Sequence, residues 1–162
     1  MASIKLRAAA ITAMAIAAVG VLLWACGGDG LETFTVTGRS MEPTLSQGTE
    51  VLVEPYSDTL PAFGDLVVYR VPGPPQRFFV HRVIGLPGET VEVRNETLFI
   101  NGEPLGEEAY IDEPVFYTMA AVDVPQGFYF VLGDNRNNSP DSHLETRGPI
   151  PFEDVIGRVV ID

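Results

Sequence analysis

The sequence predicts a small, mostly β domain, with antiparallel strands in a barrel-like sheet, carried on a single N-terminal transmembrane helix. Thirteen prolines and sixteen glycines indicate many short turns, which suit short strands better than long helices. The segments between those turns are valine-rich or alternate apolar with polar residues, as half-buried strands do. With 162 residues, the chain is long enough for one domain with its own hydrophobic core.

The first expected element is an apolar segment over residues 8–26, which contains 19 residues without a charge. As a helix it would be roughly 28 Å long, close to the ~30 Å hydrocarbon core of a bilayer. Lys5 and Arg7 precede it, and basic residues favour the cytoplasmic side. We therefore expect residues 1–7 in the cytoplasm, a single-pass anchor in the lipid of the cell membrane, and residues 27–162 outside the cytoplasm.

Three other interpretations of this apolar segment stay open. A cleaved secretory signal would have a shorter apolar core, of about 7–15 residues. The sequence Leu23-Trp24-Ala25-Cys26 resembles a lipoprotein signal, although Trp24 stands where such signals prefer a small residue. A buried core helix would need partners that a strand-rich chain does not obviously supply.

Short strands are expected after the glycine-rich joint at residues 27–30. Turns at Asn95-Glu96 and Asn101-Gly102 separate strand-like runs and predict tight hairpin connections. Residues 106–124 are acidic and poorly patterned, so a surface excursion is expected there. The expected strands cover residues 34–37, 50–54, 66–71, 78–84, 90–94, 97–100, 128–132 and 155–161.

Charge and composition restrict the possible functions. The formal net charge is −12 at pH 7, and such an acidic domain repels phosphate backbones, so no nucleic-acid partner is expected. Candidate bases are scarce, because Lys5 is the only lysine and His81 and His143 are the only histidines. Cys26 is the only cysteine, so an intramolecular disulfide cannot form.

Three polar segments, in this order and behind an apolar helix, resemble the conserved boxes of the type I signal peptidases. The first resembles the nucleophile box, the second the box that carries the general base, and the third the Gly-Asp-Asn box. They are residues 38–45 (GRSMEPTL), 80–89 (VHRVIGLPGE) and 133–142 (GDNRNNSPDS). The resemblance extends from about residue 8 to residue 162 and implies a signal-peptidase-like fold.

The resemblance implies that Ser40 is the nucleophile, and a serine needs a neighbouring base. Bacterial members of the family usually carry a lysine where this chain has His81, whereas members from the endoplasmic reticulum and from archaea carry histidine. Lys5 lies beyond the expected anchor, so His81 is the expected base. Its ordinary pKa of about 6.5 predicts that activity falls on acidification through about pH 6–7. His143 has no counterpart as a base and is expected to be exposed.

Further roles follow from the same resemblance. Asp141 is expected to be the third catalytic member that orients His81, with Asp134 as the alternative. Asp134 is otherwise expected to pair with Arg82 as structural support beneath the site. Ser139 is expected to hydrogen-bond near the base.

The loop around the nucleophile is expected to supply the oxyanion hole. Some relatives use a serine hydroxyl two residues before the nucleophile, but this chain has Gly38 there. The hole is then expected to depend on the backbone N–H of Ser40. Met41 and Pro43 are expected to shape the loop and the substrate groove.

The implied function is that of a membrane-anchored serine endopeptidase, which cleaves N-terminal signal peptides from exported preproteins. By resemblance, the substrate has small residues one and three positions before the cut. No metal or organic cofactor is implied. Two alternatives stay open: a processing peptidase dedicated to one secreted substrate, and a catalytically silent relative that binds signal peptides or scaffolds an export complex.

Overall fold

The computed structural model describes residues 23–24 and 30–161, where the chain consists of short strands, loops and two single-turn 3₁₀ helices. The helices are η1 (Arg136–Asn138) and η2 (Phe152–Asp154). The strands are β1 (Leu23–Trp24), β2 (Glu32–Thr35), β3 (Glu50–Glu54), β4 (Leu66–Val71), β5 (Arg77–Gly85), β6 (Thr90–Arg94), β7 (Thr97–Ile100), β8 (Glu103–Pro104), β9 (Met119–Asp123), β10 (Phe128–Leu132), β11 (Ile150–Pro151) and β12 (Val155–Val160).

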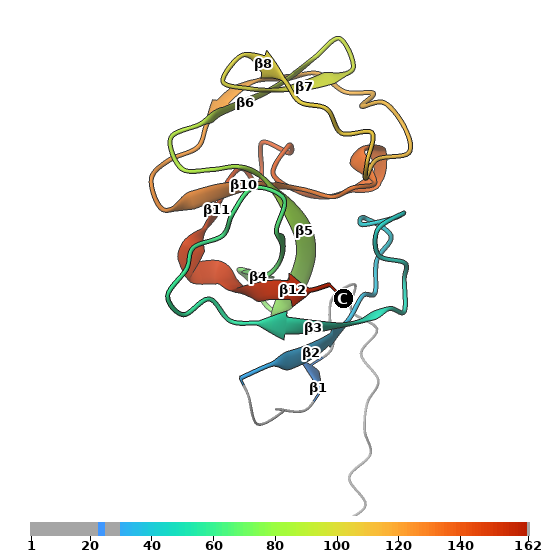
Figure 1. The fold of residues 1–162 in the computed structure, drawn as a ribbon, viewed down its shortest axis with the longest axis vertical. Coiled ribbons are helices and arrows are strands. Elements are labelled where there is room, and N and C mark those ends of the chain that lie inside the picture. Colours follow the sequence, from blue (N-terminus) through green and yellow to red (C-terminus); the bar gives the residue numbers. More distant parts are fainter. Residues whose placement is uncertain (1–22, 25–29, 162) are drawn as a thin grey trace, which may run out of the picture.

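The strands form two antiparallel sheets, which confirms the mostly β, antiparallel fold. The larger sheet has the order β1-β2-β3-β12-β4-β5-β10-β11, and the smaller has the order β8-β7-β6-β9. In Figure 1 the larger sheet curls round the lower part of the domain, and β6, β7 and β8 lie above it.

Strands β4 and β5 are covered on both faces, which explains why β4 reads as a nearly continuous apolar run. Leu66 and Val68 pack in one apolar cluster with β2, β3 and β12. Val67 and Tyr69 point to the opposite face and pack in a second cluster with β10 and β11. A third cluster fills the space between the smaller sheet and β10.

Pairing along both edges of β5 brings distant segments together. On one edge β4 pairs with it, and Val67 stands opposite His81. On the other edge lies β10, whose last residue Leu132 stands opposite Arg82. The chain that follows β10, residues 133–142, therefore begins beside the middle of β5.

Most of the predicted strands are confirmed. The predicted ranges 50–54, 66–71, 90–94, 97–100 and 128–132 are the observed β3, β4, β6, β7 and β10. The hairpin turn at Asn95-Glu96 and the tight turn at Asn101-Gly102 also form, and all four residues have the positive φ that such turns need.

The prediction for residues 106–124 is wrong in part, because this segment contains β9. This strand pairs with β6 across an irregularity between Val91 and Val93. Most of its residues are exposed, so the alternation that marks a half-buried strand is absent from its sequence. The first predicted strand also shifts, from residues 34–37 to Glu32–Thr35.

Most of the predicted anchor lies outside the described residues. Only Leu23 and Trp24 of that segment are described, and they form β1, paired with β2, where a helix was expected. Within residues 23–24 and 30–161, no helix has the length and apolar character needed to span a bilayer.

Candidate active site

Ser40 lies in the loop of residues 36–49 that joins β2 to β3, and the loop is held from two sides. Met41 is fully buried in the apolar cluster beneath it. On the other side, the N–H of Asn135 donates to the carbonyl oxygen of Ser40 at 2.9 Å. The Asn135 side-chain amide donates to the carbonyl oxygen of Arg39 at 3.1 Å. Asn135, in the third polar segment, thus holds the backbone of Arg39 and Ser40 in place.

His81 projects from the middle of β5 and is fully buried. Its Nε2 lies 3.2 Å from Ser40 Oγ and also 3.2 Å from Ser139 Oγ. The fold therefore brings the expected nucleophile, the expected base and one expected supporting hydroxyl together from three separate segments.

The other ring nitrogen of His81 faces a tyrosine instead of an aspartate. Nδ1 lies 2.9 Å from the hydroxyl of Tyr69. Asp141 Oδ2 accepts the Gly133 N–H at 2.8 Å, and Oδ1 accepts the backbone N–H of His143 at 3.1 Å. In the described part of the chain, Asp141 is therefore not the direct hydrogen-bond partner of His81 that the sequence suggested. The Tyr69 hydroxyl takes the position at Nδ1 that a carboxylate has in a Ser-His-Asp triad.

His143 is also placed differently from the expectation. Its side chain is 17% exposed, and its Nδ1 lies 2.7 Å from Asp141 Oδ1. Its ring stacks on Tyr117, with centroids 4.3 Å apart. The sequence predicted that His143 would be exposed. The turn that begins at Asp141 instead brings the His143 side chain back onto the Asp141 carboxylate.

Asp141 is buried and ionised. Burial alone raises the pKa of its carboxyl, but the hydrogen bond from His143, the proximity of His81, and the hydrogen bonds from Gly133 and Ser139 outweigh burial and hold it below the ordinary value. Since Ser139 donates to this carboxylate, its oxygen keeps lone pairs directed toward His81. Asp141 thus reaches His81 through Ser139 and through its charge.

Burial controls the basicity of His81. Removal of the ring from water lowers the pKa of His81 to about 4, although the nearby charge of Asp141 opposes this effect. Arg147 adds to the lowering and Asp134 again opposes it. The buried position of this side chain on β5 therefore favours a pKa below the expected 6–7. A neutral ring is what a general base needs before the reaction.

Beneath the site, Arg82 and Asp134 form a bidentate ion pair. The guanidinium donates from Nε at 2.8 Å and from Nη2 at 2.6 Å to the two carboxylate oxygens. Thr44 donates to the same carboxylate at 2.5 Å, and Arg82 also donates to the carbonyl oxygen of Gly64 at 3.1 Å. The pair therefore connects β5, the Ser40 loop and the segment after β10. It occupies both oxygens of Asp134, whose hydrogen bonds go to Arg82 and Thr44 and act on His81 only through the charge of the carboxylate.

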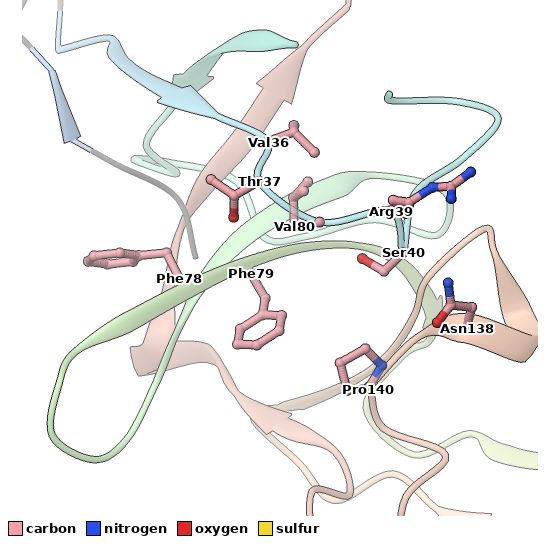
Figure 2. A pocket seen from close by; sticks show the side chains of 10 residues that line it. Val36, Thr37, Arg39, Ser40, Phe78, Phe79, Val80, Asn138 and Pro140 are labelled. Carbon is pink, nitrogen blue, oxygen red and sulfur yellow. The ribbon is translucent and has the colours of Figure 1, made fainter. Parts of the chain in front are cut away.

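A groove opens beside Ser40. It has a volume of about 250 Å³ and is lined by residues 36–40, by residues 78–80 of β5, and by Asn138 and Pro140. Figure 2 shows the Ser40 side chain between β5 and the segment that carries Asn138 and Pro140. The lining is mostly apolar, and this groove runs directly past the expected nucleophile.

The expected oxyanion loop borders this groove. Gly38 lines it, and a Cβ atom built there would meet no heavy atom within 4 Å, so the backbone beside Ser40 is open to a bound chain. Pro43 is exposed at the outside of the loop and does not line the groove, which limits its expected contribution to loop shape.

Sequence reasoning missed several buried polar residues around the site. Tyr69 stood in an apolar strand run and gave no signal of its own. Arg136 is buried, donates to Glu107 at 2.6 Å and to the Gly133 carbonyl at 3.0 Å, and so braces the third segment. Its place directly after Asp134-Asn135 was the only sequence signal for this role.

Among residues 23–24 and 30–161, no cluster of three His, Cys, Asp or Glu side chains suits a metal ion.

Comparisons with known proteins show which family this chain resembles. A family model described as "Signal peptidase, peptidase S26" matches residues 5–162. A probable signal peptidase I-1 of Synechocystis is 45% identical over 134 residues, which cover 77% of this chain and 67% of that protein. A signal peptidase I of Leptolyngbya laminosa is 41% identical over 146 residues, covering 82% of this chain and 70% of that protein.

Two further relatives extend the comparison. Thylakoidal processing peptidase 1 of Arabidopsis thaliana is 38% identical over 141 residues, which are 80% of this chain but only 41% of that protein. The crystal structure of a signal peptidase I from Enterococcus faecalis V583 is similar with a TM-score of 0.51 and 33% identity, over 64% of this chain and all of that one.

Proposed function

The chain belongs to the signal peptidases of the peptidase S26 family, and we propose that it cleaves its substrate with Ser40 as the nucleophile and His81 as the general base. As a member of this family, the protein is a serine peptidase that removes signal peptides from preproteins. The observation that carries the proposed mechanism is the 3.2 Å contact between Ser40 Oγ and His81 Nε2. The same contact favours catalysis over the alternative of a silent relative.

In the proposed reaction, Ser40 Oγ attacks the carbonyl carbon of the scissile bond while its proton passes to His81 Nε2. The protonated ring then gives this proton to the leaving amine, and the peptide bond breaks to leave an acyl-enzyme on Ser40. A water molecule attacks that ester, His81 takes its proton and returns it to Ser40, and the signal peptide leaves with a new carboxyl group. A neutral, buried His81 is suited to both proton transfers.

Ser139 and Asp141 are proposed to stabilise the protonated ring together. When Nε2 carries the proton, the Ser139 oxygen can accept a hydrogen bond from it, because the Ser139 hydroxyl donates to Asp141. The charge of Asp141 favours the imidazolium in the same way, since it raises the pKa of His81. Asp141 therefore remains part of the proposed site, and it acts on the His81 ring through the hydroxyl of Ser139.

The oxyanion is proposed to bind at the backbone N–H of Ser40, with Arg82 and Asp134 holding the loop in place from below. Gly38 supplies no side-chain donor, so the developing charge depends on backbone groups and water. Substrate recognition is proposed to occur in the groove of about 250 Å³ beside Ser40. Its mostly apolar lining suits the small apolar side chains expected near the cut.

Membrane anchoring is part of the proposal. The uncharged run of residues 8–26 is long enough to span a bilayer as a helix, although Leu23 and Trp24 near its end pair with β2 in the structure. Lys5 and Arg7 favour a cytoplasmic N-terminus. The catalytic domain would then lie outside the cytoplasm, on one face of the cell membrane. An anchor would confine enzyme and preprotein to the same surface and raise their effective concentration.

Cleavage of a signal-bearing preprotein by the full-length protein in detergent tests the mechanism. We expect Ser40→Ala and His81→Gln to lower kcat by about 10⁴-fold or more, with the folded structure intact by circular dichroism. Ser46→Ala is the matched control, because Ser46 is an exposed serine in the same loop, and it should cleave like the wild type. A folded His81→Gln variant with wild-type kcat would overturn the proposed base.

A further inference from the structure

We infer that Tyr69 is the positioning residue of His81, which holds the ring in the tautomer that can accept the proton of Ser40. This inference rests on the proposed role of His81 as general base. It assigns to a neutral tyrosine hydroxyl the function that a carboxylate has in a Ser-His-Asp triad.

The two side chains meet because of the pairing of β4 and β5. Tyr69 stands opposite Phe79, two residues before His81 on β5, so Tyr69 and His81 are diagonal neighbours on one face of the sheet. Tyr69 is 2% exposed, and its ring stacks on that of Phe79 with centroids 6.2 Å apart. Packing against Phe79 therefore holds the Tyr69 ring, and its hydroxyl lies 2.9 Å from His81 Nδ1.

The proton balance of the ring gives this contact its importance. A neutral histidine carries its proton on one nitrogen only, and the other nitrogen is the acceptor. To receive the proton of Ser40, His81 must have a free Nε2 and must therefore carry its proton on Nδ1. That N–H needs an acceptor in a fully buried position, and the Tyr69 oxygen is the group within reach. The acceptor also serves the doubly protonated ring that forms during the reaction.

The surroundings of Tyr69 support the role of acceptor. Arg147 hydrogen-bonds to the Tyr69 side chain, and a guanidinium can only donate. Burial and then the nearby charge of Asp141 raise the pKa of Tyr69, so the hydroxyl stays neutral throughout the reaction. A hydroxyl oxygen has two lone pairs, so the Tyr69 oxygen can accept from Arg147 and still accept from the N–H of His81.

The test is Tyr69→Phe, which removes the hydroxyl and keeps the ring that packs against Phe79. A lost hydrogen bond to a charged group corresponds to a fall in kcat of about 10- to 100-fold, with KM unchanged. Tyr129→Phe is the matched control, because Tyr129 is a second buried tyrosine in the same apolar cluster, and it should leave kcat unchanged.

Nitrogen-15 NMR gives a readout that a structural role alone would not change. His81 and His143 are the only histidines, so a His143→Gln spectrum assigns the signals. We expect the wild type to carry its proton on Nδ1 of His81, and Tyr69→Phe to show a mixture of tautomers. Unchanged tautomer signals together with wild-type kcat in Tyr69→Phe would overturn the inference.

The pH profile separates positioning from a general loss of structure. Asp141 and Asp134 favour the protonated ring, while Arg147 and His143 oppose it. Tyr69→Phe removes none of these four charges, although Arg147 loses its hydrogen bond to the Tyr69 side chain. Loss of the Tyr69 acceptor disfavours the protonated ring further, so the acidic fall in kcat/KM should move to lower pH. His81→Gln separates the proposed base from the role of Tyr69. Full activity in His81→Gln would overturn His81 as the base. An inactive His81→Gln together with a fully active Tyr69→Phe would overturn only the role of Tyr69.

Discussion

Gly133 and Ser40 approach each other so closely that a Cβ atom on Gly133 would lie 2.4 Å from the carbonyl oxygen of Ser40. The same Cβ would lie 2.3 Å from Ser139 Oγ. Neither contact is possible without movement, so only a glycine at this position allows the segment after β10 to touch the nucleophile loop. The distances among Ser40, Ser139 and His81 depend on this close contact between Gly133 and the nucleophile loop.

We therefore expect Gly133→Ala to lower kcat by about 100-fold, because it pushes the two serines away from His81 and misplaces reacting groups by about an ångström. The measurement is single-turnover cleavage of a preprotein. Gly106→Ala is the control, since its new Cβ would meet only the mobile end of Glu108, and it should keep wild-type activity. Wild-type kcat in a folded Gly133→Ala protein would contradict the steric argument.

Removal of Asp134 should destabilise the domain far more than removal of a comparable surface partner. Asp134 is fully buried as a side chain and pairs with Arg82, which is 12% exposed. Asp134→Ala leaves that guanidinium without its partner, at a cost of about 3–5 kcal/mol in the free energy of unfolding.

Arg70 and Asp154 provide the matched comparison, because this pair has a similar distance of 2.9 Å but an arginine that is 43% exposed. Asp154→Ala should cost less than about 1 kcal/mol. Urea unfolding of both variants measures the difference. Equal losses would mean that the Arg82–Asp134 pair adds little to stability despite its burial.

Gly38 offers a test of the oxyanion hole by gain of function. A Cβ at this position has free space within 4 Å, so Gly38→Ser can be accommodated and brings a hydroxyl two residues before Ser40. An added donor should raise kcat by about 10-fold or more, since loss of one such donor costs about 100- to 1000-fold in other hydrolases. Gly38→Ala adds the same Cβ without the hydroxyl, and equal kcat values for the two variants would count against an oxyanion site here.

Most of the site residues could be predicted from the sequence, because they lie in short segments that resemble the family boxes. Ser40, His81 and Ser139 were placed by the three polar segments, and the fold joins them. Tyr69 could not be foreseen, because its contact with His81 depends on the register between β4 and β5, and a one-residue shift would turn Tyr69 to the other face. The partner of Asp141 was missed for a different reason. Local turn geometry directs its carboxylate to His143, and residue type alone does not reveal that direction.

The pH dependence of cleavage should reflect the burial of His81. Because burial lowers the pKa of His81 to about 4, kcat/KM should stay flat from pH 7 to about pH 5 and fall only near pH 4. A preprotein without titratable groups near the cut keeps substrate ionisation out of the profile. An acidic limb at pH 6–7 would show that water reaches His81 in the free enzyme.

The same shift predicts how the stability of the fold depends on pH. The unfolded chain protonates His81 near pH 6.5, whereas the folded protein does so only near pH 4. Between these values the unfolded state binds more protons, so the free energy of unfolding falls as the pH falls. By pH 4 the protonation of His81 in the unfolded chain should lower the free energy of unfolding by about 3 kcal/mol. Above pH 7 this loss is absent. The full-length His81→Gln protein lacks the titrating ring and keeps every carboxylate, so the difference between the two urea-unfolding curves at pH 7 and pH 4.5 isolates His81. Parallel changes in the two proteins would show that the ring is protonated as easily in the folded state as in the unfolded one.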